Sequence, residues 1–277
     1  MKKTKKDISV IITCYNSSKT LRRAFNSIVE QTILASEIII IDDCSNDQNK
    51  TFNLIKLLYQ EYRYLFKIII IRNNKNQGVA NSRNIGWKIA KKTFIAFLDA
   101  DDTWHPSKLE IQYKFMSSNP RIKFSGHFHA SVNEEYSKKT KFENTINVKY
   151  SNLLIKNPFI TPSVMVRRFV KVRFYKNKRF MEDHLLWIML GYNSGTVIIP
   201  LKLAKIFKRP YGESGLSNNM LAMEKGDLEN YLILLKLNYI GPLSFLILSG
   251  LSLIKFIKRL FFVLGLKTLQ KLKNNER

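Results

Sequence analysis

Three carboxylates gather in residues 99–102, and they are the first candidates for chemistry in this sequence. Asp99 and Asp101 stand at positions i and i+2 after an apolar run, and Asp102 follows them. In a tight turn the first two can face one divalent ion or a diphosphate, and their oxygens suit Mg²⁺ or Mn²⁺. The alternative is structural, with Asp99 capping a helix or Asp102 closing a turn. Since one cap needs fewer than three carboxylates, the pattern favours a metal or diphosphate site.

The pattern of apolar residues indicates which elements position these carboxylates. Short runs rich in Ile or Phe alternate with amphipathic stretches, as in parallel strands joined by crossover helices. The predicted strands span residues 9–13, 37–42, 67–72 and 93–98, and the predicted helices between them span residues 19–31, 51–64 and 80–91. Polar residues follow each strand, and ligands bind in open α/β sheets beyond the carboxyl ends of the strands. We therefore expect an α/β fold whose site lies at that edge of the sheet.

The second half of the chain has a less regular pattern. The predicted elements are helices over residues 107–118 and 182–192, strands over residues 122–129 and 163–168, and a polar surface excursion over residues 138–149. Ser107 is the expected N-cap of the first of these helices. The second carries large apolar residues around most of its circumference, which predicts that it is buried.

The composition narrows the class of protein and its partners. With 45% hydrophobic residues among 277, the chain has enough apolar surface for a folded core. Its two cysteines, Cys14 and Cys44, exclude a disulfide-stapled scaffold and a structural zinc site, and indicate a reducing compartment. The formal net charge is +25, and residues 121–277 hold 27 basic against 10 acidic side chains. Such a charge attracts nucleic acid, an anionic membrane or a phosphorylated small molecule.

Five short motifs stand in order along residues 8–190. They are Val-Ile-Ile-Thr-Cys-Tyr-Asn at residues 10–16, Ile-Asp-Asp-Cys-Ser-Asn-Asp at 41–47, Asn-Gln-Gly-Val-Ala-Asn-Ser-Arg-Asn-Ile-Gly at 76–86, Phe-Leu-Asp-Ala-Asp-Asp at 97–102 and Met-Glu-Asp-His-Leu-Leu-Trp at 181–187. Asp-x-Asp alone is common in turns, but the five motifs together resemble the family 2 glycosyltransferases, the inverting group with the GT-A fold. The resemblance implies a nucleotide-sugar-binding, Rossmann-like and mostly parallel sheet flanked by helices. After it we expect a hydrophobic or amphipathic helical tail at the C-terminal end.

The resemblance also implies a role for individual residues. The donor-binding residues that it implies are Thr13, Tyr15, Asp43, Gly78, Arg83 and Asp99. Asp101 would bind a Mn²⁺ or Mg²⁺ ion directly, with Asp102 behind it. Asp183, at a helix start where backbone N–H groups keep a carboxylate ionised, would be the base that takes the proton of the acceptor hydroxyl.

Each of these residues also has a purely structural interpretation. Tyr15 can cover the core at a strand end, and Arg83 can be a solvated charge on a helix. Asp43 or, more readily, Asp42 can cap the helix that follows. Residues 182–183 can be an acidic pair that the helix dipole alone favours at a helix start. The four histidines have no spacing typical of a metal site, and His184 is left outside the candidate site.

A basic run precedes the candidate base. Its cations are Arg167, Arg168, Lys171, Arg173, Lys176, Lys178 and Arg179, with no anion among them. An anionic acceptor, a membrane surface or plain solvation accounts for such a run. Nucleic acid is the weakest interpretation, since no helix-turn-helix, zinc-finger or RNP-like pattern accompanies the charge. We therefore expect no nucleic-acid partner.

The C-terminal segment differs in kind from the rest of the chain. Residues 237–254 contain no charge, and as a helix they would span about 27 Å, close to the roughly 30 Å hydrocarbon thickness of a bilayer. Glycine and proline weaken a spanning helix, so we expect an interfacial or re-entrant arrangement, with the basic stretch after residue 254 on anionic headgroups. The alternative is a helical hairpin packed on the core.

These patterns predict an inverting, metal-dependent glycosyltransferase. It would move a sugar from a nucleotide-sugar donor, by family habit a UDP-sugar, to a glycan or lipid-linked acceptor in bacterial cell-surface polysaccharide or lipopolysaccharide synthesis. We expect residues 1–106 to bind the donor, residues 107–236 to bind the acceptor and residues 237–277 to associate with a membrane. The expected location is the cytoplasmic face of the bacterial inner membrane, held peripherally or through a re-entrant tail.

Other classes of protein fit the sequence less well. No Gly-x-Gly-x-x-Gly follows the first predicted strand, and no Gly-Lys-Ser or Gly-Lys-Thr occurs, which argues against a dinucleotide-dependent oxidoreductase and a P-loop NTPase. The competing class is a non-catalytic membrane- or nucleic-acid-binding protein on a nucleotide-sugar fold.

Overall fold

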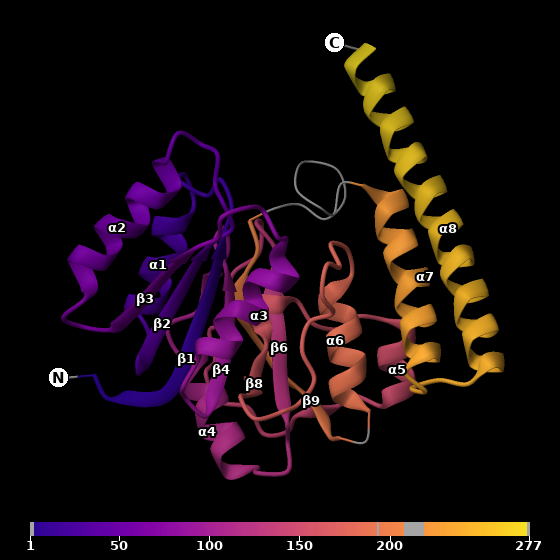
Figure 1. Ribbon diagram of the computed structural model, residues 1–277. Helices are drawn as coiled ribbons and strands as arrows, with labels where there is room; N and C mark the ends of the chain where they lie inside the picture. Colours follow the sequence, from indigo (N-terminus) through magenta and orange to yellow (C-terminus); the bar gives the residue numbers. More distant parts are fainter. Residues whose placement is uncertain (1–2, 193, 208–218, 276–277) are drawn as a thin grey trace.

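One mixed sheet organises the molecule. The computed structural model describes residues 3–192, 194–207 and 219–275, with side chains in its last helix up to Phe261. Within these ranges nine strands form a single sheet in the order β3-β2-β1-β4-β8-β6-β9-β5, with β7 beside β9. Helices cover both faces of the sheet (Figure 1). The expected α/β class is therefore confirmed.

The first four strands form the parallel part of the sheet. The strands are β1 (Lys5–Cys14), β2 (Leu34–Asp42), β3 (Lys67–Arg72) and β4 (Phe94–Asp99), and the helices that join them are α1 (Leu21–Val29), α2 (Lys50–Tyr62) and α3 (Val79–Ile89). The predicted strands and helices lie within these elements or overlap them by all but a few residues. In the ladder Thr13 pairs with Asp99, and Cys14 pairs with Asp42. The polar residues that end these strands therefore stand in line at one edge.

The second half of the chain extends the sheet beyond β4. Its strands are β5 (Thr103–Trp104), β6 (Phe124–Ala130), β7 (Ile146–Asn147), β8 (Met165–Arg167) and β9 (Thr196–Lys205), and its helices are α4 (Lys108–Ser118), α5 (Tyr150–Ile155), the 3₁₀ turn η1 (Thr161–Ser163) and α6 (Glu182–Gly191). Strand β8 runs antiparallel to β4, which joins the two halves into one sheet. The predictions for α4, β6, β8 and α6 are confirmed, while β5, β7, β9 and α5 were not predicted. Ser107 stands before α4, but its side chain makes no capping hydrogen bond.

Two hydrophobic layers hold the helices against the sheet. On one face α1, α2 and α4 pack on even-numbered residues of β1 such as Val10 and Ile12. On the other face α3, α6 and the later helix α7 (Met220–Lys236) pack on Ile11 and its neighbours, around a cluster of aromatic rings that includes Trp187. Helix α6 is buried along nearly its whole length, as its sequence predicts. Both α3 and α6 are thereby fixed on the same face, with their first turns free to contribute to a site.

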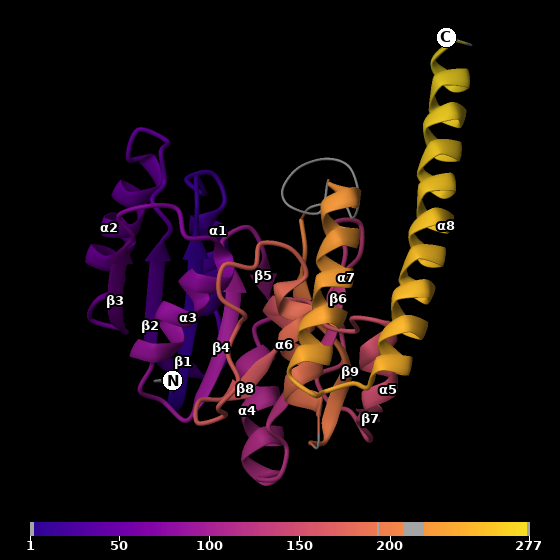
Figure 2. The same cartoon turned by 45° about the vertical axis from the view of Figure 1, so that its right-hand side comes forward.

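The chain ends in a pair of helices, α7 (Met220–Lys236) and α8 (Pro242–Asn275). Figure 2 shows α8 running beside α7 and extending past the rest of the molecule. Leu248 and Ser252 of α8 are buried against the body, so the helical-hairpin alternative describes the first half of α8 correctly. Among the helices of the described ranges, none combines the length and the apolar character that crossing a membrane requires. The division of the chain at residues 106 and 236 stays a prediction.

Candidate active site

A pocket opens where β1 and β2 end and the loop before α3 begins. Its volume is about 250 Å³. The residues that line it are Thr13, Cys14, Tyr15, Asp43, Asn76, Gly78, Val79, Ser82 and Arg179. Four of the six implied donor-binding residues thus meet in one cavity at the carboxyl ends of the strands, which is where an α/β sheet binds its ligand. We call this cavity the donor pocket.

Asp43 holds the wall of the donor pocket together. It is buried, and its carboxylate accepts hydrogen bonds from Asn73 Nδ2 at 2.7 Å, the Gln77 backbone N–H at 2.9 Å and the Gly78 backbone N–H at 2.8 Å. An ionised carboxylate offers about four lone-pair sites, so the hydrogen bonds from the described residues leave one site for a ligand. Asp43 therefore fixes the loop before α3 while it still faces the pocket.

Asp42 plays a different part from its neighbour. Its carboxylate accepts hydrogen bonds from Ser45 N at 3.1 Å and Ser45 Oγ at 2.5 Å, and it lies 3.2 Å from the guanidinium of Arg72. The residue that bonds the first turn of α2 is Asp47, which accepts from Thr51. The suggestion that Asp42 caps the following helix is therefore wrong in its detail, because Asp42 closes the turn before that helix.

Gly78 has a backbone conformation that requires glycine. Its φ is 85° and its ψ is 158°, a region that essentially only glycine adopts. This conformation directs its N–H to Asp43 and starts α3 at Val79. A Cβ at Gly78 would lie 3.8 Å from Arg179 Cγ, so the conformation, and not the space, excludes other residues.

Tyr15 lies in the loop that follows β1 and forms part of the pocket mouth. It is 46% exposed, so its alternative role as a cover over the core is wrong. The next residue, Asn16, donates its backbone N–H to Ser45 Oγ at 2.9 Å and its side-chain amide to Asn46 Oδ1 at 2.7 Å. These bonds tie the loops after β1 and β2 to each other directly beside Tyr15.

Arg83 connects the donor side of the molecule to the candidate base. It lies on α3 with a side chain 5% exposed, and its guanidinium bonds Asp99 Oδ1 at 2.7 Å and Glu182 Oε1 at 2.9 Å. Burial opposes the charge of Arg83, but the carboxylates of Asp99 and Glu182 outweigh it and raise the pKa of Arg83 above its ordinary value. The alternative of a solvated charge is wrong.

Asp183 stands in the first turn of α6, beside this ion-pair network. Its Oδ1 accepts the His184 backbone N–H at 2.6 Å, and its Oδ2 accepts from Asn157 Nδ2 at 3.4 Å. Burial raises the pKa of Asp183 above its ordinary value, Asp99 adds to this effect, and Arg83 opposes it. A carboxylate with a raised pKa is a better proton acceptor once ionised. Glu182 takes the ion pair with Arg83, which leaves Asp183 as the residue suited to act as a base.

His184 lies outside the site, as expected. It is buried, and its Nε2 lies 2.7 Å from the carbonyl oxygen of Leu153 in α5. This contact anchors α6 to α5, and His184 is not among the residues that line the donor pocket.

Asp99 is the last residue of β4, and Asp101 and Asp102 lie in the turn that follows it. The Asp102 N–H donates to the Asp99 carbonyl oxygen at 3.2 Å and closes the turn, while Arg23 donates to the Asp101 carbonyl oxygen at 2.6 Å. Burial, followed by the charges of Asp42, Asp101 and Asp99, raises the pKa of the Cys14 thiol. The negative charges of Asp99 and Asp101 are therefore both felt by the Cys14 thiol at the end of β1.

The carboxylates of Asp99 and Asp101 fit a divalent ion whose remaining ligands come from the substrate. Among the described residues no group of three His, Cys, Asp or Glu side chains is placed to hold a metal ion. Mg²⁺ commonly binds through one or two carboxylates and takes its remaining ligands from substrate phosphates and water. Asp99 and Asp101 form a donor set of that size and chemistry.

Arg179 is a pocket residue that the sequence analysis left in the basic run. The segment before α6 is fastened to α3 by two asparagines. Asn81 exchanges hydrogen bonds with Asn177 at 2.9 and 3.2 Å, and Asn84 exchanges them with the Phe174 backbone at 2.8 and 3.1 Å. These contacts place Arg179 over Gly78 at the donor pocket. No spacing signal in the sequence reveals them, because they join residues 90 and 96 positions apart.

Three of the seven cations in the basic run face the interior. Arg167 donates to the carbonyl oxygens of Met116, Asn119 and Ile122, and Lys178 donates to the carbonyl oxygen of Gly226. Arg173 lies over the Trp87 ring, 4.4 Å from its centroid. The suggestion of a simple solvated or anion-attracting run is therefore wrong for these three, and the exposed cations are Arg168, Lys171, Lys176 and Arg179.

Comparison with known proteins supports the resemblance. An uncharacterized glycosyltransferase of Rickettsia felis is 33% identical over 207 residues, which cover 72% of this chain and 32% of that protein. The Escherichia coli protein WfaP, a UDP-Glc:alpha-D-GlcNAc-diphosphoundecaprenol beta-1,3-glucosyltransferase, is 40% identical over 111 residues, 40% of this chain and 41% of WfaP. The matched region thus spans about a third of the Rickettsia relative and less than half of WfaP.

The fold has a counterpart among solved structures. The crystal structure of Staphylococcus aureus TarS 1–349 in complex with UDP-GlcNAc superposes with a TM-score of 0.65 and 21% identity, over 82% of this chain and 66% of that one. The likeness confirms the expected GT-A fold. Residues 9–183, which contain all the residues of the donor pocket and Asp183, match the family described as glycosyl transferase family 2. This chain therefore belongs to glycosyl transferase family 2.

Proposed function

We propose that this protein transfers a sugar, with inversion, from a UDP-sugar to a hydroxyl group of a glycan or lipid-linked acceptor. The observation that carries the proposal is the pair of ion pairs made by Arg83. One guanidinium joins Asp99, at the end of β4, to Glu182, at the start of α6, directly beside Asp183. A group suited to accept a proton therefore stands next to the carboxylates expected at the donor.

The donor pocket supports a nucleotide ligand. Asp43 retains one acceptor site for a ring N–H of the base, and the exposed ring of Tyr15 offers a surface for stacking. Arg179 supplies a cation at the same cavity. UDP is the proposed nucleotide because WfaP is named as a glucosyltransferase that uses UDP-Glc and because TarS was solved in complex with UDP-GlcNAc.

The proposed reaction is a single displacement at the anomeric carbon. The acceptor oxygen attacks from the face opposite the leaving group, its proton passes to a carboxylate oxygen of Asp183, and the bond between the anomeric carbon and the diphosphate oxygen breaks to release UDP. Arg83 holds Asp99 and Glu182 in place throughout. Asp99 and Asp101 would hold a Mn²⁺ or Mg²⁺ ion, which when bound neutralises the charge that develops on the diphosphate.

The proposed acceptor is a lipid-linked sugar or a growing glycan used in bacterial cell-surface polysaccharide or lipopolysaccharide synthesis. WfaP acts on a GlcNAc-diphosphoundecaprenol, as its name states, and this supports an acceptor that carries a diphosphate and a lipid. A lipid-linked acceptor is consistent with a location at the cytoplasmic face of the inner membrane, which we propose for this protein.

A donor panel tests the proposal. The full chain is incubated with UDP-, GDP- and dTDP-sugars, Mn²⁺ or Mg²⁺, and GlcNAc diphosphate linked to a short alkyl chain, and both nucleotide release and product configuration are measured. We expect UDP release that depends on acceptor, and a product of inverted anomeric configuration. Release from a GDP- or dTDP-sugar alone would refute the choice of UDP, and a retained configuration would refute the mechanism.

A further inference from the structure

Helix α8 has a large apolar surface that faces away from the protein. Its side chains between 38% and 71% exposed include Leu243, Leu246, Ile247, Leu251, Leu253, Ile254, Ile257, Leu260 and Phe261. They recur every three or four residues, so they form a continuous stripe along the helix. We call these nine residues the outer face of α8. A stripe of this size on a protein surface marks a contact with an apolar partner.

The opposite side of α8 is occupied. Leu248 and Ser252 are buried, and Phe245 packs on the core that contains α6 and α7. Lys255 Nζ donates to the Ile155 carbonyl oxygen at 2.5 Å, which fixes the helix to the end of α5. The orientation of the stripe is therefore set by packing, and rotation of α8 cannot bury it against the body.

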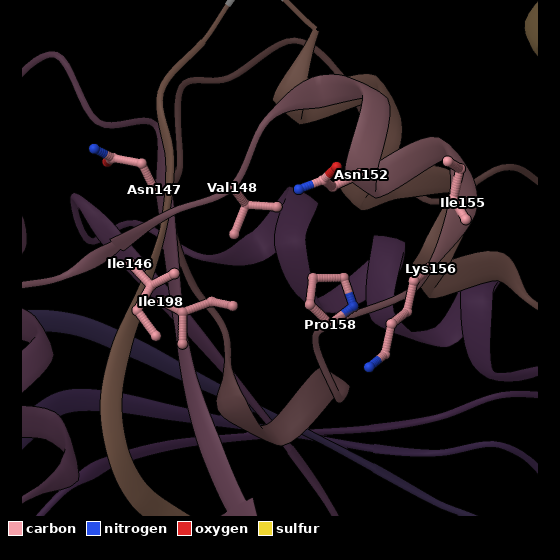
Figure 3. Close-up of a pocket in the computed structure, with 8 residues that line it drawn as sticks. All are labelled: Ile146, Asn147, Val148, Asn152, Ile155, Lys156, Pro158 and Ile198. Carbon is pink, nitrogen blue, oxygen red and sulfur yellow. The ribbon is translucent and has the colours of Figure 1, made fainter.

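An apolar pocket lies on the same flank, beside α5. It has a volume of about 350 Å³, and its lining residues are Ile146, Asn147, Val148, Asn152, Ile155, Lys156, Pro158 and Ile198. Figure 3 shows these side chains around the pocket; most come from β7, α5 and β9, and Val148, Lys156 and Pro158 come from the segments beside β7 and α5. Ile146 and Ile155 are each more than two fifths exposed. Since Lys255 of α8 bonds Ile155, this pocket continues the apolar surface next to α8.

The charge of α8 selects the kind of partner. Residues 242–275 contain six Lys or Arg and no Asp or Glu, and the whole chain carries a net charge of +25. A second copy placed on the outer face would bring two strongly basic helices together, and like charges oppose that contact. An anionic bilayer offers apolar chains to the stripe and negative headgroups to the cations beside it.

We propose that the outer face of α8 binds in the plane of an anionic lipid surface. Figures 1 and 2 show α8 running from the region of α5 toward the side on which the parallel strands end, and beyond it. A bilayer along α8 would therefore flank the rim that bears the donor pocket, within reach of a headgroup-linked acceptor. The inference goes beyond the sugar-transfer proposal, since lipid binding is measured without any substrate.

Vesicle sedimentation tests this inference with two matched variants. The test variant is L246S/I254S, with side chains 65% and 52% exposed on the outer face, and the control is L57S/L221S, with side chains 50% and 72% exposed on α2 and α7. Both variants exchange nearly the same amount of exposed apolar surface, and none of the four residues lines the donor pocket. We expect the wild type and the control to bind vesicles of phosphatidylglycerol and phosphatidylcholine equally well, and the test variant to bind about tenfold more weakly or worse. Binding of the wild type should fall with added salt and on pure phosphatidylcholine.

Three outcomes would overturn the inference. They are absence of vesicle binding by the wild type, equal binding by the test and control variants, and equal binding to neutral and anionic vesicles. Light scattering without lipid adds a further check. Self-association that L246S/I254S abolishes, with no binding to vesicles, would assign the outer face to a second copy. Each of these results leaves the proposed sugar transfer open to its own assay.

Discussion

Arg83 determines the charge balance of the candidate active site. Its one positive charge faces Asp99 and Glu182 at bonding distance, and the charge of Asp183 also raises its pKa. Burial raises the pKa of both Glu182 and Asp183 because it removes water from the charged carboxylates. The charge of Asp183 adds to this effect at Glu182 and the charge of Asp99 adds to it at Asp183, while Arg83 opposes it at both. Asp183 is therefore less readily ionised than an ordinary surface aspartate.

This balance leads to a pH dependence. Asp183 accepts a proton only when it is ionised, so activity should be lost as the pH falls through its pKa. Because burial raises that pKa above the ordinary value of 3.8, the acid limb of kcat/KM should lie above 3.8. The measurement is kcat/KM against pH with saturating metal. An acid limb at or below 3.8 would contradict the assigned base.

Arg179 gives a prediction at the donor pocket. We expect R179A to weaken UDP binding by about ten- to a hundredfold, because a hydrogen bond to a charged group contributes about 1.5–3 kcal/mol. The matched control is K176A, which removes an exposed cation of the same run that does not line the pocket. Calorimetric titration with UDP measures both. Equal UDP affinity in the two variants would remove Arg179 from the site.

The sequence predicts the role of a site residue better when a local motif marks that residue than when only the fold brings it to the site. Asp43, Gly78, Asp99 and Asp183 stand at strand ends or helix starts, where motif and position agree. Arg179 and Asn157 have no such signal, because Arg179 reaches the pocket only through the bonds from Asn81 and Asn84 to a distant segment. Their roles follow from tertiary contacts alone.

The elements that position the site are the parallel strands and α3. Their boundaries are predictable because buried parallel strands have continuous apolar sequences and the crossover helices have clear stripes. Strand β9 was not predicted, and its sequence explains why. It contains Pro200, which cannot donate to a ladder, and the pairing of β6 with β9 shifts register between His127 and Phe128, at that point. A proline inside an apolar run argues against a strand, except where a bulge in the sheet accommodates the proline.

The start of α3 gives a prediction about stability. G78A should lower the free energy of unfolding by about 1–3 kcal/mol, because alanine is strained at a φ of 85° and a ψ of 158°. The control is G250A in α8, where a new Cβ meets nothing within 4 Å and alanine favours the helix. Urea unfolding measures both. A G78A protein as stable as the wild type would show that this turn is not required.

For the whole molecule, the net charge has several origins. Part of the basic run before α6 is structural, since Arg167, Arg173 and Lys178 bond backbone carbonyls or lie on a ring. Composition cannot separate these cations from those of α8, because burial depends on the packing of distant segments. The C-terminal helix was predictable from its apolar sequence, whereas its division into a packed side and an outer face required the structure.

The assignment of Asp183 as the base is tested most directly by two measurements on D183N, kcat for sugar transfer and affinity for UDP. Replacing Asp183 with Asn keeps the size of the side chain and removes the proton acceptor, so kcat for sugar transfer should fall by about 10²–10⁴-fold. UDP affinity should stay within about twofold of the wild type, because Asp183 does not line the donor pocket. A D183N protein that transfers sugar at the wild-type rate would contradict the assignment of Asp183 as the base.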